Sequence, residues 1–218
     1  MLVWEFHTRL FHWLLVLAFG FALVTGLIAD LDWMEWHIRA GYFILGLLIF
    51  RLLLGVMGAD YGHFGRLTLS PFAIREYLRT GRDRRGRRYA GHNPLGSWMV
   101  IVMLLAILVQ VLSGFMTTDD IFTEGPWVAW ADDQWISWAS WTHSNNYWLL
   151  IGLMSLHIIA IGFYELVKKQ PLVKAMWSGR KAVDAVDSNS KDSRRTPWWL
   201  VSLNVVLAVA ATLFLIEL

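Results

Sequence analysis

The sequence contains no cysteine, and only 17% of its 218 residues are charged. The lack of cysteine excludes disulfides, thiolate zinc sites, iron–sulfur clusters and covalently attached c-type haem. Inside the apolar stretches the only acid is Glu165, near an end. Zinc and non-haem iron sites gather three or four ligands at one point, so they fit this chain poorly.

The residues that are present are strongly apolar, with a hydrophobic share of 56% and a positive mean hydropathy. About 20 apolar residues suffice for a helix to cross a bilayer. Five stretches meet this length, at residues 10–28, 37–57, 95–117, 142–167 and 198–216. We therefore predict an all-α integral membrane protein, with a four-helix transmembrane bundle and a fifth C-terminal transmembrane helix.

The connecting segments alternate in charge. Residues 58–94 carry eight arginines and three acids, and residues 168–197 carry eight basic residues and three acids. Residues 29–36 and 118–141 contain acids and no basic residue. By the positive-inside rule, the N-terminus is cytoplasmic and the C-terminus periplasmic. A basic loop tethered between spans, such as Arg82–Arg88, anchors topology, and we expect no nucleic-acid partner.

The acidic segment at residues 126–141 is rich in tryptophan. We interpret it as an interfacial aromatic belt on a surface-lying helix, which is compatible with a docking surface for an external partner. Residues 188–195, SNSKDSRR, are typical of a flexible linker. The domains expected are the four-helix membrane domain at 1–169, a basic cytoplasmic linker at 170–196 and the last helix at 197–218.

The fourth span carries His143 and His157, fourteen residues apart. In a helix this spacing brings both side chains to within about 40° of one face and separates them by roughly 21 Å along the axis. An ionisable residue inside a span is costly and indicates function. The pair is typical of one ligand to each of two stacked metal centres, most plausibly haems.

Histidines on two other spans lie at matching depths. Span one enters the membrane from the inside, so His12 lies near the cytoplasmic side. Span two enters from the outside, so His37 lies near the external surface. The depths pair His12 with His157 and His37 with His143, each across two helices. Two six-coordinate haems in a four-helix bundle need this arrangement of four histidines.

The same fourteen-residue step connects His12 to Gly26 and His37 to Arg51. Gly26 would let a haem approach span one, and Arg51 would pair with a propionate or a lipid phosphate. Arg9 is a second propionate candidate, one turn before His12, and Gly41 leaves space one turn after His37. Glycines in membrane helices also serve simple helix packing.

The remaining histidines fit other roles. His7 is five residues from His12, so both cannot ligate one iron. His63 and His92 lie in or beside the basic loop and are expected to be solvated, although His92 and Asn93 would also suit the wall of a quinone site. The fifth span offers only Asn204 as a polar core residue, and its role is not evident from the sequence.

Several stretches together resemble the bacterial di-haem cytochrome b561 family, which includes cytochrome b subunits of nickel–iron hydrogenases. They are VWEFHTRLFHW around His12, HIRAGYFILGLLIFRLLLGVMG from His37, AGHNPLGSWMVIVMLLAILVQVLSGF, and the pair His143 and His157. The resemblance covers residues 3–169. It implies two b-type haems with bis-histidine ligation, a location in the bacterial inner membrane, and electron exchange between the quinone pool and a partner.

The function expected is electron transfer between quinone or quinol and a periplasmic c-type cytochrome or redox subunit. Two alternatives remain open: a self-contained superoxide:quinone oxidoreductase, and a haem-free transporter or scaffold with proton-relay histidines. Broken helices and internal repeats, which are typical of transporters, are not evident. Whether the chain is itself an enzyme, and whether it forms a homo-oligomer, stays open at this point.

Overall fold

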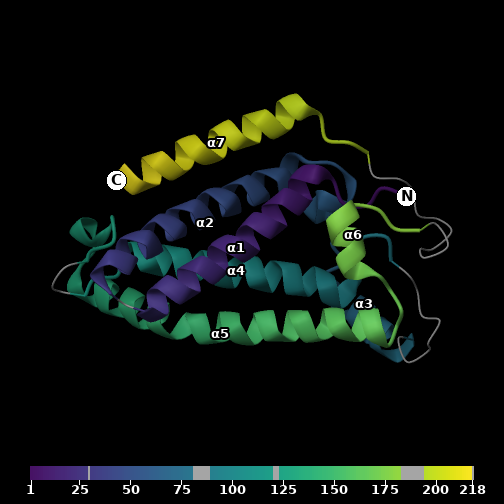
Figure 1. Ribbon diagram of the computed structural model, residues 1–218, viewed down its shortest axis with the longest axis horizontal. Helices are drawn as coiled ribbons and strands as arrows, with labels where there is room; N and C mark the ends of the chain where they lie inside the picture. Colours follow the sequence, from purple (N-terminus) through teal and green to yellow (C-terminus); the bar gives the residue numbers. More distant parts are fainter. Residues whose placement is uncertain (29, 81–88, 120–122, 183–193, 218) are drawn as a thin grey trace. The chain divides into compact units, whose positions relative to one another are not determined.

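A computed structural model describes residues 1–28, 30–80, 89–119, 123–182 and 194–217 (Figure 1). These residues form seven α-helices and three single-turn 3-10 helices. The α-helices are α1 (Phe6–Ile28), α2 (Leu31–Met57), α3 (Pro71–Thr80), α4 (Pro94–Phe115), α5 (Asp133–Leu166), α6 (Leu172–Ser178) and α7 (Trp198–Glu217). The 3-10 helices are η1 (Asp60–Gly62), η2 (Phe64–Arg66) and η3 (Val128–Trp130).

Five of these helices are long and apolar enough to cross a membrane, namely α1, α2, α4, α5 and α7. They contain 20 to 34 residues, and they begin and end within a few residues of the five predicted spans, except that α2 begins six residues earlier and α5 nine residues earlier. Their composition is hydrophobic nearly all round, as expected for helices that face both lipid and protein. The prediction of a multi-pass, all-α membrane protein is confirmed.

Local sequence explains where several helices begin and end. Pro94 opens α4, and the Asn93 side chain accepts a hydrogen bond from the Gly96 amide at 2.7 Å. Asp132 precedes α5 and accepts from the Trp135 amide at 2.9 Å. Both are N-caps that satisfy amides left free in the first turn. Gly179 ends α6 with a φ of 78°, a conformation that glycine adopts without steric cost.

The tryptophan-rich segment at residues 126–141 differs from the prediction. Instead of a separate surface helix, the structure has the short η3 turn followed by α5, which runs without a break from Asp133 through His143. Continuous backbone hydrogen bonding costs less than a break in apolar surroundings, because each free amide there is unsatisfied. The arginine run at residues 82–88 and most of the expected linker at 188–195 lie outside the described residues.

The chain divides into two compact units, each assembled from three segments. Unit 1 comprises Met1–Leu10, Leu53–Met103 and Leu153–Val201. Unit 2 comprises Phe11–Leu52, Leu104–Gly152 and Ser202–Leu218. The division expected from sequence, into a four-helix domain, a linker and a last helix, stays a prediction.

In unit 2, α7 packs against α2 (Figure 1). Gly46 of α2 lies so close to Thr212 of α7 that an added Cβ would be 3.3 Å from the threonine hydroxyl. Small residues at a crossing let two membrane helices approach closely. At the end of α7, the Leu215 carbonyl accepts a hydrogen bond from the Trp127 indole at 2.7 Å. The fifth helix is therefore packed into unit 2 by both contacts.

In unit 1, the chain before α1 pairs with the segment after α6. The amides of Val3 and Trp4 both donate to the Gly179 carbonyl, at 2.8 and 3.0 Å. Val3 and Trp4 are buried together with Ala175 of α6. The N-terminal segment is thereby fixed by main-chain bonds and by a small apolar core of its own.

Candidate functional site

The imidazole rings of His37 and His143 lie next to each other, edge to face, in unit 2. His37 lies on α2 and His143 on α5, and the ring centroids are 5.9 Å apart with an interplanar angle of 89°. The two helices thus bring together a pair of side chains that are separated by more than a hundred residues in the sequence. Both are neutral nitrogen donors of the kind that metals prefer.

Each of these rings forms a hydrogen bond to a helix carbonyl through its own Nδ1 atom. His37 Nδ1 is 2.8 Å from the Ala22 carbonyl of α1, and His143 Nδ1 is 2.9 Å from the Gln110 carbonyl of α4. A carbonyl can only accept, so Nδ1 carries the proton in both rings. The lone pair is then on Nε2, which is the usual arrangement of a metal-binding histidine and the partner that orients it.

Glycines lie directly beside both rings. A Cβ added to Gly26 would be 2.8 Å from Cε1 of His37, and one added to Gly114 would be 2.8 Å from Cε1 of His143. Real Cβ atoms do not approach so closely, so only glycine fits at either position. Gly26 was expected to face a haem, and the structure places the His37 ring itself against it.

Side-chain hydrogen bonds add a second link between α4 and α5. The Gln110 amide donates to the His143 carbonyl at 3.0 Å, and Asn146 donates to Gln110 Oε1 and to the Ala106 carbonyl, both at 2.9 Å. Neither Gln110 nor Asn146 was singled out from the sequence. Their signal was the presence of two amide side chains inside predicted spans, where polar groups hold helices together.

Three other predicted residues occupy distinct surroundings. Gly41, one turn after His37, has no atom within 4 Å of an added Cβ, so space is open beside that face of α2. Arg51 is buried within α2, with 5% of its surface exposed. Arg9 donates to the Trp177 carbonyl near the end of α6, where a cation interacts favourably with the helix dipole. Contacts of these residues with a cofactor stay predictions.

The second predicted ligand pair is divided between the units. His12 lies in unit 2, with its ring edge-to-face on Trp13 at 5.0 Å, and His157 lies in unit 1. Their pairing therefore stays a prediction. Within the described part of the chain, no three His, Asp or Glu side chains converge on one point. The candidate ligands occur at most in pairs.

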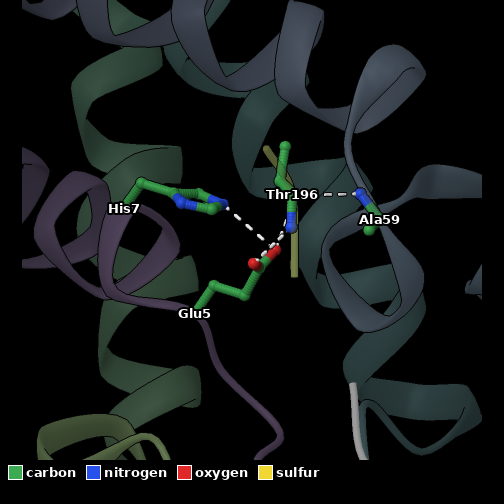
Figure 2. Close-up of polar contacts among 4 residues, drawn as sticks. All are labelled: Glu5, His7, Ala59 and Thr196. Carbon is green, nitrogen blue, oxygen red and sulfur yellow. Dashed lines mark hydrogen bonds and ion pairs between the residues drawn. The ribbon is translucent and has the colours of Figure 1, made fainter. Parts of the chain in front are cut away.

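Unit 1 contains a polar cluster around Glu5 (Figure 2). The Glu5 carboxylate accepts hydrogen bonds from the Thr196 amide and hydroxyl, both at 2.7 Å, and lies 3.2 Å from His7 Nε2. The Ala59 amide donates to the same hydroxyl at 3.1 Å. Burial alone would raise the pKa of Glu5, but hydrogen bonds from His7 and Thr196 outweigh it and leave that pKa below its usual value.

A second polar cluster in unit 1 surrounds Asn93. Its amide donates at 3.1 Å to the hydroxyls of both Tyr77 and Tyr164, and these two hydroxyls also contact each other. Burial raises the pKa of Tyr77, and its contact with Tyr164 adds to this. His92 stacks in a tilted arrangement on Trp4 at 4.8 Å. A role for His92 or Asn93 in quinone binding stays a prediction.

Comparisons with known proteins agree with the resemblance in the sequence. The family model described as prokaryotic cytochrome b561 matches residues 3–179. The chain is 23% identical over 215 residues to a probable Ni/Fe-hydrogenase B-type cytochrome subunit of Cupriavidus necator, with 81% of this chain and 85% of the relative covered. No solved structure matches the chain.

The family model extends over α1, α2, α4 and α5, three of which carry the candidate histidines, and ends before α7. Cytochromes of this family bind haem b and transfer electrons in membranes, and the apolar spans of this chain are those of a multi-pass membrane protein. The chain belongs to the prokaryotic cytochrome b561 family.

Proposed function

We propose that this protein is a di-haem b cytochrome that transfers electrons between the membrane quinone pool and a periplasmic redox partner. The observation that carries the proposal is the pair formed by His37 and His143, whose rings are 5.9 Å apart and both protonated on Nδ1. Family membership supports haem b as the group that this pair holds.

The spacing of the two rings suits one metal ion between them. A transition metal binds an imidazole nitrogen at about 2 Å, so two rings that held one ion between them would have centroids roughly 6 Å apart. The 5.9 Å between His37 and His143 agrees with this value. Open space beside Gly41, one turn from His37, supports room for a flat macrocycle on the same face.

Haem, when bound, supplies one-electron redox chemistry, and the chain supplies position and surroundings. Two histidines at one iron leave no open coordination position, which disfavours oxygen binding or activation there. The Ala22 and Gln110 carbonyls hold the ring protons away from the iron side. The apolar helices exclude water, so electrons cross the barrier without movement of a charged carrier.

The second haem is proposed between His12 and His157. Their depths, deduced from the order of the spans, and their positions in the family-like stretches support this pairing. Arg51 and Arg9 are the proposed propionate partners, since a guanidinium forms charge-assisted hydrogen bonds with carboxylates. Gly26 and Gly41 complete the proposed cofactor contacts.

The basic loops support an orientation with the N-terminus in the cytoplasm and the C-terminus in the periplasm. In this orientation His37 and His143 lie on the periplasmic side. The bacterial inner membrane is the proposed location, because the family is prokaryotic and the proposed function requires contact with the membrane quinone pool.

The printed name of the relative supports a redox enzyme, such as a hydrogenase, as one class of partner. The proposed contact surface is the outer face with exposed tryptophans and acids. Trp130, Trp135, Trp138 and Trp141 are 63–79% exposed. Acids in the same segment would attract a basic patch on a c-type cytochrome or redox subunit and speed encounter.

Haem quantification tests the proposal. Purified full-length protein is expected to contain two haems b by pyridine haemochrome, with an α-band in the reduced-minus-oxidised spectrum. His143→Ala and His157→Ala should each remove one haem, whereas His63→Ala, in the loop after α2, should retain both. Absence of haem would overturn the proposal in favour of the transporter or scaffold. Superoxide-dependent quinone reduction without a protein partner would favour the self-contained oxidoreductase.

A further inference from the structure

The two carbonyls that hold the histidines each receive a second side-chain hydrogen bond. The Thr25 hydroxyl is 3.1 Å from the Ala22 carbonyl, which also accepts from His37 Nδ1. The Ser113 hydroxyl is 3.1 Å from the Gln110 carbonyl, which also accepts from His143 Nδ1. Both hydroxyl residues are buried, Thr25 fully and Ser113 with 7% exposed.

These residues occupy the same register on two different helices. Residues 22–26 of α1 read ALVTG and residues 110–114 of α4 read QVLSG. In each segment, the first residue provides the accepting carbonyl, the fourth residue provides the hydroxyl and the fifth residue is the glycine. We call each five-residue segment a histidine seat.

Helix geometry explains why a seat needs these residue types. Carbonyls in an α-helix point toward its C-terminus, so a ring bonded to the first carbonyl lies over the fifth residue, one turn further. A side chain there would collide with the ring, as the 2.8 Å approaches at Gly26 and Gly114 demonstrate. The fourth residue lies beside the same carbonyl, within reach of a serine or threonine hydroxyl.

Back-bonding of a hydroxyl to the carbonyl three or four residues earlier is common in helices. What distinguishes the seats is that the same carbonyl also orients a candidate metal ligand. A carbonyl has two lone pairs, and in a helix it already accepts the amide four residues on. Three donors therefore share two lone pairs, and each bond is weaker than it would be alone.

We propose that the Thr25–Gly26 and Ser113–Gly114 seats position the rings of His37 and His143, and that their hydroxyls set the reduction potential of the haem that these histidines hold. This rests on the proposed function. A stronger Nδ1–H bond makes an imidazole more basic toward its metal and stabilises the oxidised iron. The hydroxyl competes with that bond, so it raises the potential.

The two seats differ in how strongly the hydroxyl competes. Thr25 also donates to the Phe21 carbonyl, at 2.9 Å, which is shorter than its 3.1 Å contact with Ala22. Ser113 directs its hydroxyl to Gln110 at 3.1 Å. Removal of the Ser113 hydroxyl should therefore change the potential more than removal of the Thr25 hydroxyl.

The experiment is redox titration of purified, haem-loaded full-length protein carrying Ser113→Ala or Thr25→Val. Both changes remove the hydroxyl with little change of shape. For Ser113→Ala, we expect the oxidised-to-reduced ratio of one haem at fixed ambient potential to rise about threefold, a fall of roughly 28 mV at 59 mV per tenfold. Thr25→Val should produce a smaller fall in the same haem.

Two controls separate tuning from general disturbance of a span. Thr25→Ser retains the hydroxyl and should keep the wild-type potential. Thr212→Val removes a buried hydroxyl that donates to the Ala208 carbonyl of α7 at 2.7 Å, a carbonyl that holds no histidine. It should leave both potentials unchanged. If Ser113→Ala loses haem, the Thr25→Val and Thr25→Ser pair decides the question.

Wild-type protein without haem b would overturn the proposed function itself. Unchanged or raised potentials in the hydroxyl-deleted variants, with both haems bound, would overturn the seat proposal and leave the proposed function intact. An equal fall in Thr212→Val would likewise overturn the seat proposal.

Discussion

The two units of the chain use their buried polar groups differently. In unit 2, His37 and His143 each donate from Nδ1 to a helix carbonyl, while Asn146 donates to the Gln110 side chain, which in turn donates to the His143 carbonyl. In unit 1, buried polar groups connect segments that precede or follow helices, as Glu5 does with Thr196. Buried polar groups must be paired in either unit, and in unit 2 the Nδ1 bonds of His37 and His143 leave Nε2 of each ring for the proposed metal.

Unit 1 contains a further example of such a connection. The Lys181 ammonium donates to the carbonyls of Tyr89 and Ala90, at 3.1 and 2.7 Å. Burial lowers the pKa of Lys181 to about 8, because the charged form loses hydration. Variants at Glu5 or Lys181 in unit 1 should therefore alter stability and its pH dependence, whereas variants around His37 and His143 in unit 2 should alter haem binding.

The largest effect is expected from Gly114→Ala. The new Cβ would displace the His143 ring and break its bond to Gln110, at a cost of about 1–3 kcal/mol for overpacking together with loss of ligand orientation. We expect one haem per chain by pyridine haemochrome. The control is Gly152→Ala on α5, where an added Cβ meets no atom within 4 Å. Two haems with an unchanged spectrum in Gly114→Ala would contradict the geometry of the seat.

Asn146→Leu should have the next largest effect. It removes the bonds from Asn146 to Gln110 and Ala106 and is expected to cost about 1–2 kcal/mol of helix association. Haem release on heating, followed by absorbance, should occur at a lower temperature. Asn145→Leu is a matched control, because Asn145 bonds only to Trp141 within α5. Equal shifts in both variants would argue against the α4–α5 link.

Glu5→Gln should destabilise unit 1 by about 1–3 kcal/mol at neutral pH, because charge-assisted hydrogen bonds to Thr196 are weakened. Since the folded pKa of Glu5 lies below its ordinary value of 4.5, its contribution is fully present above that pH. The contribution is lost as the pH falls through the folded pKa.

Thermal unfolding of the purified protein at a series of pH values checks this expectation. The difference between wild type and Glu5→Gln should shrink as the solution becomes more acidic, while haem content near neutral pH stays the same. Glu124→Gln, at an exposed position, serves as the control. A difference that persists unchanged at low pH would show that charge at Glu5 is not responsible.

The smallest effect is expected at the proposed partner surface. Glu124→Lys combined with Asp133→Lys reverses two exposed charges and keeps Asp132, which caps α5. In this variant, electron transfer to a basic periplasmic cytochrome should be slower than in wild type at low salt. At high salt the two rates should become similar, because salt screens the electrostatic attraction that speeds encounter. A rate unaffected by salt in both proteins would argue against electrostatic docking.

Much of the fold could be predicted from the sequence because membrane spans follow from length and hydropathy. The five spans were found within a few residues, apart from α2, which begins six residues before its predicted start, and α5, whose start lies nine residues before the predicted one. The start of α5 was missed because tryptophans and acids at residues 126–141 are typical of a membrane interface. They do not indicate whether a helix there is separate from the following span or continuous with it. The Asp132 cap, which starts α5 nearby, is a local signal that could have identified it.

The candidate site was predicted only in part. His37 and His143 were chosen from spacing and depth, and their rings lie next to each other in an edge-to-face arrangement. Gly114, Thr25 and Ser113 were missed, because a hydroxyl followed by glycine is ordinary in a membrane helix until a ring is seen lying on it. Gly26 was expected to face a haem, and the sequence did not indicate that the His37 ring would lie against it.

The sequence by itself determined the membrane class, the number of membrane-spanning helices and the residue types available to a metal, because hydropathy, length and donor chemistry are local properties. The tertiary structure decided which carbonyl each imidazole bonds and which nitrogen keeps its lone pair. It also shows that Gly26 and Gly114 leave room for the two rings. These depend on how two helices approach each other, and a few tenths of an ångström at Gly26 or Gly114 separate a fitted ring from a collision.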